Sequence, residues 1–138
     1  MAMLPARVKH RKQQTKGYDL QHVATSCNRL DFGDFGIQAI EGGQITARQI
    51  EAARVAAGHY LGRTGKLWIR VFPHLPVSKH PAESRMGSGK GDVAYWATFI
   101  HAGTVMFELA GVSEDMAREA MRRQAHKLPL ATRLVRRG

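Results

Sequence analysis

The chain has 138 residues, the length of one domain, and a domain of this size builds a hydrophobic core without metal or disulfide support. Its one cysteine, Cys27, excludes a disulfide framework within the chain and favours a reducing compartment. No apolar run is long enough for a transmembrane helix, and the basic start lacks the apolar segment of a secretory signal. With 21 Lys and Arg against 11 Asp and Glu, the formal net charge is +10.

The positive charge is concentrated at the two ends of the chain. Residues 1–16 hold five basic residues and no acidic residue, residues 118–138 hold seven basic residues and one acidic residue, and the stretch between them is nearly neutral. Basic ends of this kind favour a polyanionic partner, and nucleic acid fits best. An acidic membrane surface fits less well because no amphipathic basic helix with aromatic anchors is present. A short organellar presequence is a minor alternative for the first residues.

The first half of the chain is predicted to contain an arm, a strand and a helix. Residues 1–30 show no apolar period and are expected to form an irregular basic arm. A strand should begin at Phe35, and Glu41 to Gly43 should form a turn. The helix should begin at Thr46, which forms a capping box with Gln49, and end at Gly62 and Gly65. Its apolar face comprises Ile50, Ala53, Ala57, Tyr60 and Leu61.

A strand and a long loop are predicted next. In Lys66–Phe72 the apolar side chains alternate, so we expect a strand central to the core, with Trp68 buried. Residues 74–92 contain prolines and glycines without an apolar period. A segment this long in a compact domain is usually functional or disordered, and we predict a functional loop.

The last part of the chain predicts a hairpin, a helix and an edge strand. Val93–His101 and Thr104–Ala110 should pair as an antiparallel hairpin. Ser113 should cap a second helix that ends before Pro129, and Leu130–Val135 should form an edge strand. The fold class is therefore α+β: a two-layer sandwich of a mostly antiparallel sheet, two helices on one face and a long glycine-rich loop. We expect an arm over residues 1–30 and a single domain over residues 31–138.

The chemistry that the sequence offers is that of binding. The seven histidines are not spaced as metal ligands, and the sequence shows no recognisable pair of nucleophile and base. We therefore expect neither a metal nor a cofactor. The glycine-rich run Gly87–Gly91 lacks the spacing of a Walker A motif. Glycines let the backbone approach a bulky ligand, and Arg85 and Lys90 are able to reach phosphates. A disordered hairpin tip is the alternative for this run.

Three segments resemble one family. RTGKLWIRVFP (Arg63–Pro73) and RMGSGKG (Arg85–Gly91) resemble the two signature segments of the large-subunit ribosomal proteins called L-sixteen in bacteria. ITARQIEAAR (Ile45–Arg54) resembles the helix start that is typical of the same family. The similarity extends over nearly the whole chain. Acidic residues between the arm and the first helix, such as Asp31 and Asp34, depart from the basic composition usual there.

The resemblance implies a structural constituent of the large ribosomal subunit and not an enzyme. Such a protein binds 23S-type rRNA and helps to shape the A-site tRNA region near the peptidyl transferase centre. Its implied partners are 23S-type rRNA, the A-site tRNA and neighbouring large-subunit proteins, with the P-site tRNA as a further partner. The resemblance implies no contact with a membrane. Its implied location is the ribosome of a bacterial cytoplasm or of an organelle matrix or stroma. A free-standing basic module that binds tRNA or DNA is the alternative.

Charge pattern and resemblance together give the residues expected to contact RNA. They are Arg7, Lys9, Arg11, Lys12, Lys16, Arg63, Lys66, Arg70, Lys79, Arg85, Met86, Gly87, Gly89, Lys90, Gly91, Arg122, Arg123 and Lys127.

Overall fold

The strands form two separate antiparallel sheets in the computed structural model, which describes residues 4–14, 20–80, 82, 87 and 89–137. The four-stranded sheet has the order β3 (Lys66–Ile69), β6 (Val105–Ala110), β1 (Phe35–Ala39) and β7 (Thr132–Arg136). The three-stranded sheet has the order β2 (Gly43–Thr46), β5 (Asp92–Ile100) and β4 (Leu75–Lys79). Among the described residues, no helix is long and apolar enough to span a bilayer.

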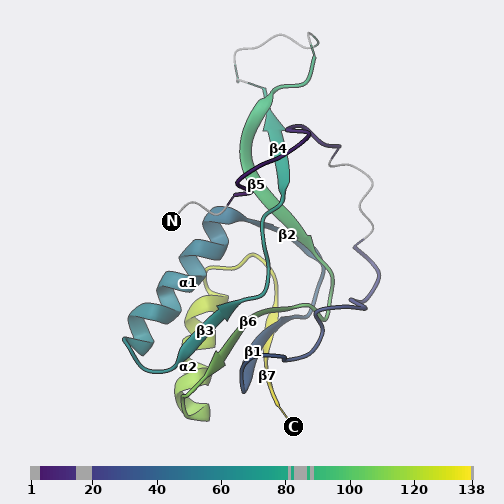
Figure 1. Ribbon diagram of the computed structural model, residues 1–138. Coiled ribbons are helices and arrows are strands. Elements are labelled where there is room, and N and C mark those ends of the chain that lie inside the picture. The colour runs from purple at the N-terminus through teal and green to yellow at the C-terminus, as the bar shows by residue number, and fades with distance from the viewer. Residues whose placement is uncertain (1–3, 15–19, 81, 83–86, 88, 138) are drawn as a thin grey trace.

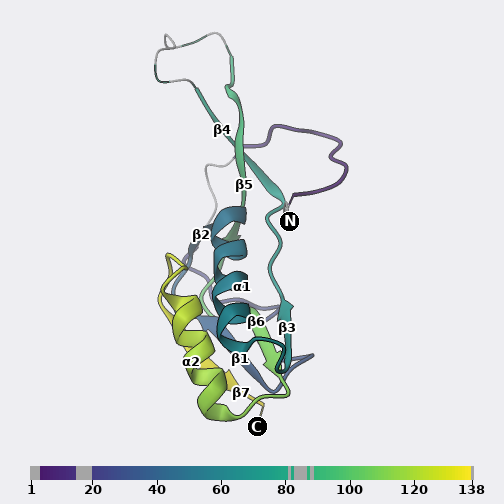
Figure 2. The same cartoon turned by 90° about the vertical axis from the view of Figure 1, so that its left-hand side faces the viewer.

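Two helices, α1 (Ala47–Leu61) and α2 (Glu114–Ala125), pack against each other on one face of the four-stranded sheet (Figure 2). The core lies between the helices and the sheet, where Ile37 and Phe107 from the strands and Ile50 and Ala120 from the helices are almost fully buried. The predicted α+β class, with two helices on one face of an antiparallel sheet, is confirmed.

Both predicted helix starts are confirmed because they depend on local hydrogen bonds. The Gln49 N–H donates to Thr46 Oγ1 at 3.3 Å, and the Thr46 N–H donates to Gln49 Oε1 at 2.9 Å, which completes the capping box. Ser113 Oγ accepts from the Met116 N–H at 3.3 Å. Gly62, with φ of +61°, ends α1 as expected.

The predicted hairpin between the two long strands is wrong, because β5 and β6 belong to different sheets. The chain between them pairs with the end of β1: the Ala39 N–H donates to the Thr104 carbonyl at 2.9 Å, and the Gly103 N–H donates to the Ala39 carbonyl at 2.7 Å. These hydrogen bonds lead the chain from β5, in the three-stranded sheet, into β6, in the four-stranded sheet. β5 pairs through its first half with β4 and through its last residues with β2.

The sequence prediction missed two strands. β2 is a short strand just before α1, in a segment expected to be a turn and a helix start. β4 occupies the start of the expected loop 74–92, so the connection at the tip of the hairpin spans only residues 80–91. Proline at position 76 is compatible with β4 because β4 is an edge strand, paired on one side only.

The strand predicted over Lys66–Phe72 is shorter and less central than expected. β3 ends at Ile69 and lies at the edge of the four-stranded sheet. Val71 is buried, but Trp68 is only half-buried and Phe72 is 48% exposed. Side chains alternate along a strand, so Trp68 lies on the opposite face from Leu67 and Ile69, which pack against the core. The expectation that Trp68 lies in the core is therefore wrong.

Candidate nucleic-acid interface

The β4–β5 hairpin projects from the body of the molecule, away from both helices (Figures 1 and 2). Its register places Lys79, the last residue of β4, opposite Asp92, the first residue of β5. The basic residue Lys90 lies at the same end of the hairpin, two residues before Asp92. The hairpin thus carries exposed positive side chains beyond the hydrophobic core.

The basic arm is attached to this hairpin. Residues 4–14 form no helix or strand and cross the hairpin (Figure 1). The Lys12 ammonium donates to the Lys90 carbonyl at 3.1 Å, and the Lys90 ammonium donates to the Gln13 carbonyl. The acceptors are neutral carbonyls, so these hydrogen bonds do not compensate the charge of either lysine, and among the described residues neither lysine forms an ion pair. Two segments that lie far apart in the sequence therefore form one basic surface.

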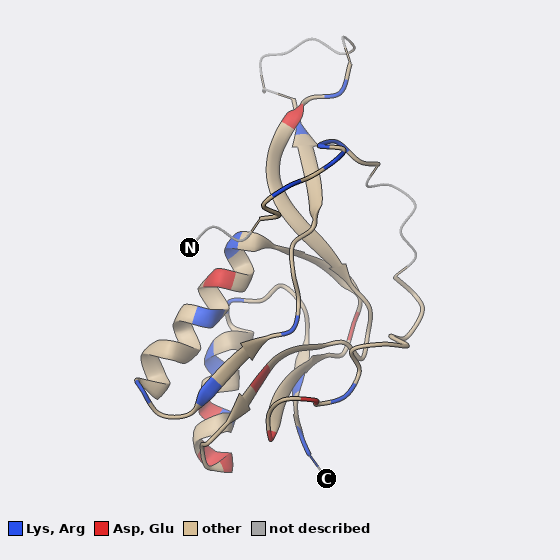
Figure 3. Ribbon diagram, in the orientation of Figure 1, with Lys and Arg blue, Asp and Glu red and all other residues tan. Residues whose placement is uncertain are grey.

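We call this surface the arm–hairpin surface and define it by six exposed basic residues (Figure 3). Its members are Arg7, Lys9, Arg11, Lys12, Lys79 and Lys90. Asp92 lies at the base of its loop, the sequence of the loop contains Glu83, and residues 4–14 contain no acidic residue. All six residues were expected from the sequence to contact RNA.

The glycines of the loop differ in what they require. Gly87 and Gly89 have φ of +95° and +90°, a conformation that favours glycine, and a Cβ at either position would meet nothing within 4 Å. A Cβ on Gly91 would lie 2.7 Å from the backbone carbonyl of Lys79. Gly91 is therefore needed for the close approach of the two hairpin strands.

A second group of expected residues lies on the helix side of the molecule. Lys127 follows α2, Arg63 lies in the connection between α1 and β3, and Lys66 is the first residue of β3; all three are exposed. Arg122 and Arg123 both bind Glu119, at 2.7 and 3.0 Å, and their hydrogen bonds lower the pKa of Glu119 to about 2. The two arginines are thus partly neutralised.

Arg123 has a further partner in the helix layer: its guanidinium lies over the Tyr60 ring, 4.6 Å from the ring centre. The expected RNA contacts therefore fall into two groups. The arm–hairpin surface extends over the projecting hairpin, and among the described residues none of its six cations forms an ion pair, whereas Arg122 and Arg123 do.

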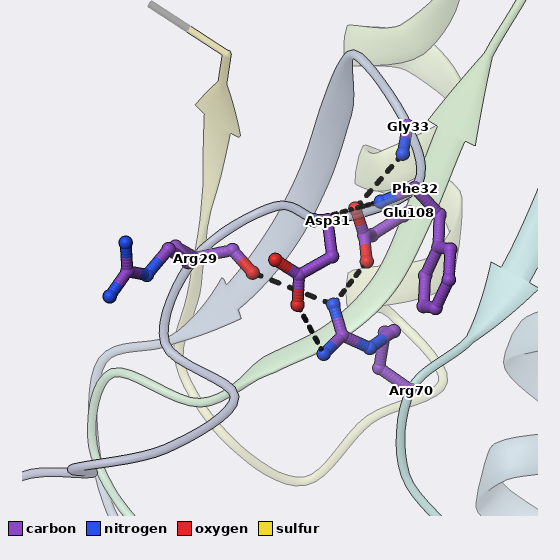
Figure 4. A network of polar contacts seen from close by, with 6 residues as sticks. All are labelled: Arg29, Asp31, Phe32, Gly33, Arg70 and Glu108. Atoms are coloured by element: carbon purple, nitrogen blue, oxygen red, sulfur yellow. Dashed lines mark hydrogen bonds and ion pairs between the residues drawn. The ribbon is translucent and has the colours of Figure 1, made fainter.

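Arg70 belongs to neither group, because its guanidinium holds the fold together (Figure 4). It donates to Glu108, to Asp31 at 3.0 Å and to the Arg29 carbonyl, and its side chain is only 11% exposed. The Glu108 carboxylate is fully buried on β6. The structure gives Arg70 a structural role, which the sequence pattern did not reveal because its partners lie far along the chain.

The Glu108 carboxylate also accepts hydrogen bonds from the backbone. The N–H groups of Asp31, Phe32 and Gly33 each donate to Oε1 at 3.0 Å. Burial raises the pKa of Glu108, but the bonds from Gly33, Arg70 and Phe32 outweigh this, so that the pKa lies below its usual value. Glu108 is therefore a buried anion satisfied by one cation and three backbone donors.

Comparison with known proteins identifies the family. Residues 5–135 match the family described as ribosomal protein L16p/L10e. The chain belongs to this family. It is 54% identical over 135 residues to the large ribosomal subunit protein uL16 of Cutibacterium acnes (strain DSM 16379 / KPA171202), an alignment that covers 98% of this chain and 96% of that protein. The resemblance inferred from the three sequence segments is confirmed.

Some expected contacts of this family member lie outside the described residues: Lys16, Arg85 and Met86. The sequence prediction in turn left out several exposed arginines. Arg29, Arg136 and Arg137 line a pocket of about 300 Å³ beside β7, together with Asn28. The excess of positive charge near the C-terminus could have indicated Arg136 and Arg137. Only the fold shows that Arg29 lies beside them.

Proposed function

We propose that this chain is a structural constituent of the large ribosomal subunit that binds 23S-type rRNA through the arm–hairpin surface. The loop at the end of the hairpin then helps to shape the A-site tRNA region near the peptidyl transferase centre, with the A-site tRNA, the P-site tRNA and neighbouring large-subunit proteins as further partners. In this role the chain performs no reaction of its own. Membership of the ribosomal protein family and the similarity to uL16 support the role.

One observation carries the assignment of the surface. The hydrogen bonds between Lys12, Gln13 and Lys90 join the arm to the hairpin, and they gather exposed cations on a projection that contributes little to the core. Cations placed in this way bind phosphates, release counterions and give an affinity that falls with salt. A projecting hairpin also reaches into a folded RNA, where a flat surface does not.

The test removes charge from the hairpin without touching the core. Lys79→Gln with Lys90→Gln should weaken binding to transcribed 23S rRNA and lower the slope of log affinity against log salt by about 1 per lost contact. Arg48→Gln with Arg118→Gln is the matched control, since it removes two exposed cations from the helices. Equal losses in the two variants would refute the assignment to the hairpin.

A salt wash separates the proposed function from its alternative. An integral subunit protein remains on large ribosomal subunits at high salt, because many contacts hold it. A free-standing basic module that binds tRNA or DNA leaves as counterions compete. Complete release of this chain at moderate salt would therefore favour the alternative.

A further inference from the structure

A partly exposed aromatic pair lies at the edge of the four-stranded sheet, outside the arm–hairpin surface. Phe32, in the loop before β1, is 57% exposed, and its ring stacks with that of Trp68 on the edge strand β3. The ring centres are 6.0 Å apart and the ring planes differ by 22°. This spacing is that of offset stacking, and the 57% exposure of Phe32 leaves part of the pair in solvent.

Two cations flank the pair. The Lys66 ammonium lies 5.8 Å from the centre of the Trp68 ring, and the Arg70 guanidinium lies 5.1 Å from the centre of the Phe32 ring. Arg70 is already engaged with Glu108 and Asp31. Within the described part of the chain, no carboxylate lies within ion-pair distance of Lys66, so its charge is available to an outside ligand.

The backbone on both sides of Phe32 is fixed, although its ring is in solvent. Three consecutive N–H groups of this loop, that of Phe32 included, donate to the buried Glu108 (Figure 4). Two residues after Phe32, the Asp34 N–H donates to the Leu109 carbonyl at 2.8 Å. A Cβ on Gly33 would lie 2.5 Å from that same carbonyl. A buried ionic network thus presents an apolar ring to the outside.

A ring that is 57% exposed gains little by burial, so packing of the hydrophobic core does not account for the position of Phe32. A rigid ring is a good binding element, since it loses little conformational freedom when a ligand stacks on it. The area of two rings is small for a protein partner, which needs several hundred Å² per side. A planar, anionic ligand suits two partly exposed rings with a lysine beside them that forms no ion pair among the described residues.

We propose that the Phe32–Trp68 pair is a stacking site for an unpaired RNA base, with Lys66 contacting the adjoining phosphate. Unpaired bases in RNA are commonly recognised by stacking on aromatic side chains. The site rests on the proposed RNA-binding function and adds a second contact, on a different face from the arm–hairpin surface. It recognises single-stranded RNA in a loop or bulge, because bases within a duplex are not open to stacking.

The first experiment compares two exposed phenylalanines. Phe32→Leu keeps apolar volume but loses the aromatic face, and it should weaken binding to 23S rRNA about tenfold. Phe32→Tyr should retain the parent affinity. Phe72→Leu is the matched control, since Phe72 is 48% exposed and has no stacked ring among the described residues. Parent affinity in a folded Phe32→Leu variant would overturn the proposal.

A second experiment keeps Phe32 and so does not depend on that variant folding. With Trp96→Phe, Trp68 is the one remaining tryptophan and reports on the stack by its fluorescence. Titration with a short oligoadenylate should quench this fluorescence, whereas a duplex RNA of the same length should quench it much less. Equal quenching by both, or none by either, would contradict base stacking at this pair.

The outcomes also separate this site from the proposed function. If 23S rRNA binds and the hairpin variant Lys79→Gln with Lys90→Gln weakens it, while Phe32→Leu does not, the stacking site alone fails. If the parent protein does not bind 23S rRNA, the proposed function itself fails.

Discussion

Replacing Glu108 by glutamine should strongly destabilise the fold, although the two side chains have nearly the same shape. One carboxylate oxygen accepts three backbone N–H groups and the other accepts the Arg70 guanidinium. A glutamine amide has one oxygen and one NH₂ group, so one of these two sets of donors would face another donor. Glu108→Gln therefore leaves buried donors unsatisfied and removes the main counter-charge of Arg70.

The expected size follows from this geometry. Removing one partner of a buried ion pair costs about 3–5 kcal/mol. Arg70 keeps Asp31 as a partner and is 11% exposed, so we expect the lower end, about 3 kcal/mol. Unfolding entropy is about 2.1 cal/mol/K per residue, which for 138 residues corresponds to a fall in Tm of about 10 °C.

The assay is thermal unfolding of the free protein followed by circular dichroism. Glu119→Gln is the control, because Glu119 also binds arginines but lies on the surface of α2, where loss of the carboxylate should hardly change Tm. Glu108→Gln combined with Arg70→Met should recover part of the loss, since no unpaired buried charge remains. A Tm for Glu108→Gln within about 2 °C of the parent would refute this reasoning.

The same network sets a dependence on pH. Because the pKa of Glu108 is lowered in the folded protein, its contribution is fully present above the ordinary value of 4.5 and is lost as the pH falls towards the lowered pKa. The Tm of the parent should therefore fall below pH 4.5, and the Tm of Glu108→Gln should fall less over the same range. A parallel fall in both proteins would show that other groups control acid stability.

Further substitutions test the backbone and the helix cap, each by its Tm. Gly58→Ala should stabilise the protein by about 0.5–1 kcal/mol, because Gly58 lies within α1 and a Cβ there meets nothing within 4 Å. Gly91→Ala should instead destabilise the hairpin, since its Cβ would collide with the Lys79 backbone; an unchanged Tm with unchanged rRNA binding would contradict this. Ser113→Ala should cost about 1 kcal/mol through loss of the α2 cap, whereas Ser113→Asp should retain the cap.

Features governed by near neighbours in the chain were predictable. The capping box at Thr46 and the cap at Ser113 join residues three apart, so their patterns predicted both helix starts. The strand at Phe35 and the edge strand near the C-terminus followed from alternation. The sequence showed that the arm is basic and that Lys79 and Lys90 are candidate RNA contacts. It did not show that the arm and the hairpin lie together on one surface.

The helices, the basic ends and the family were evident from the amino-acid sequence, because each depends on local spacing or on short segments read in order. Tertiary structure decided which strands pair, since β5 and β6 lie next to each other along the chain but hydrogen-bond in different sheets. It also decided the role of Arg70, which a charge pattern assigned to RNA and which Glu108, 38 residues away, draws into the fold. Partners that distant are brought together only by packing of the whole chain, and no local pattern records them.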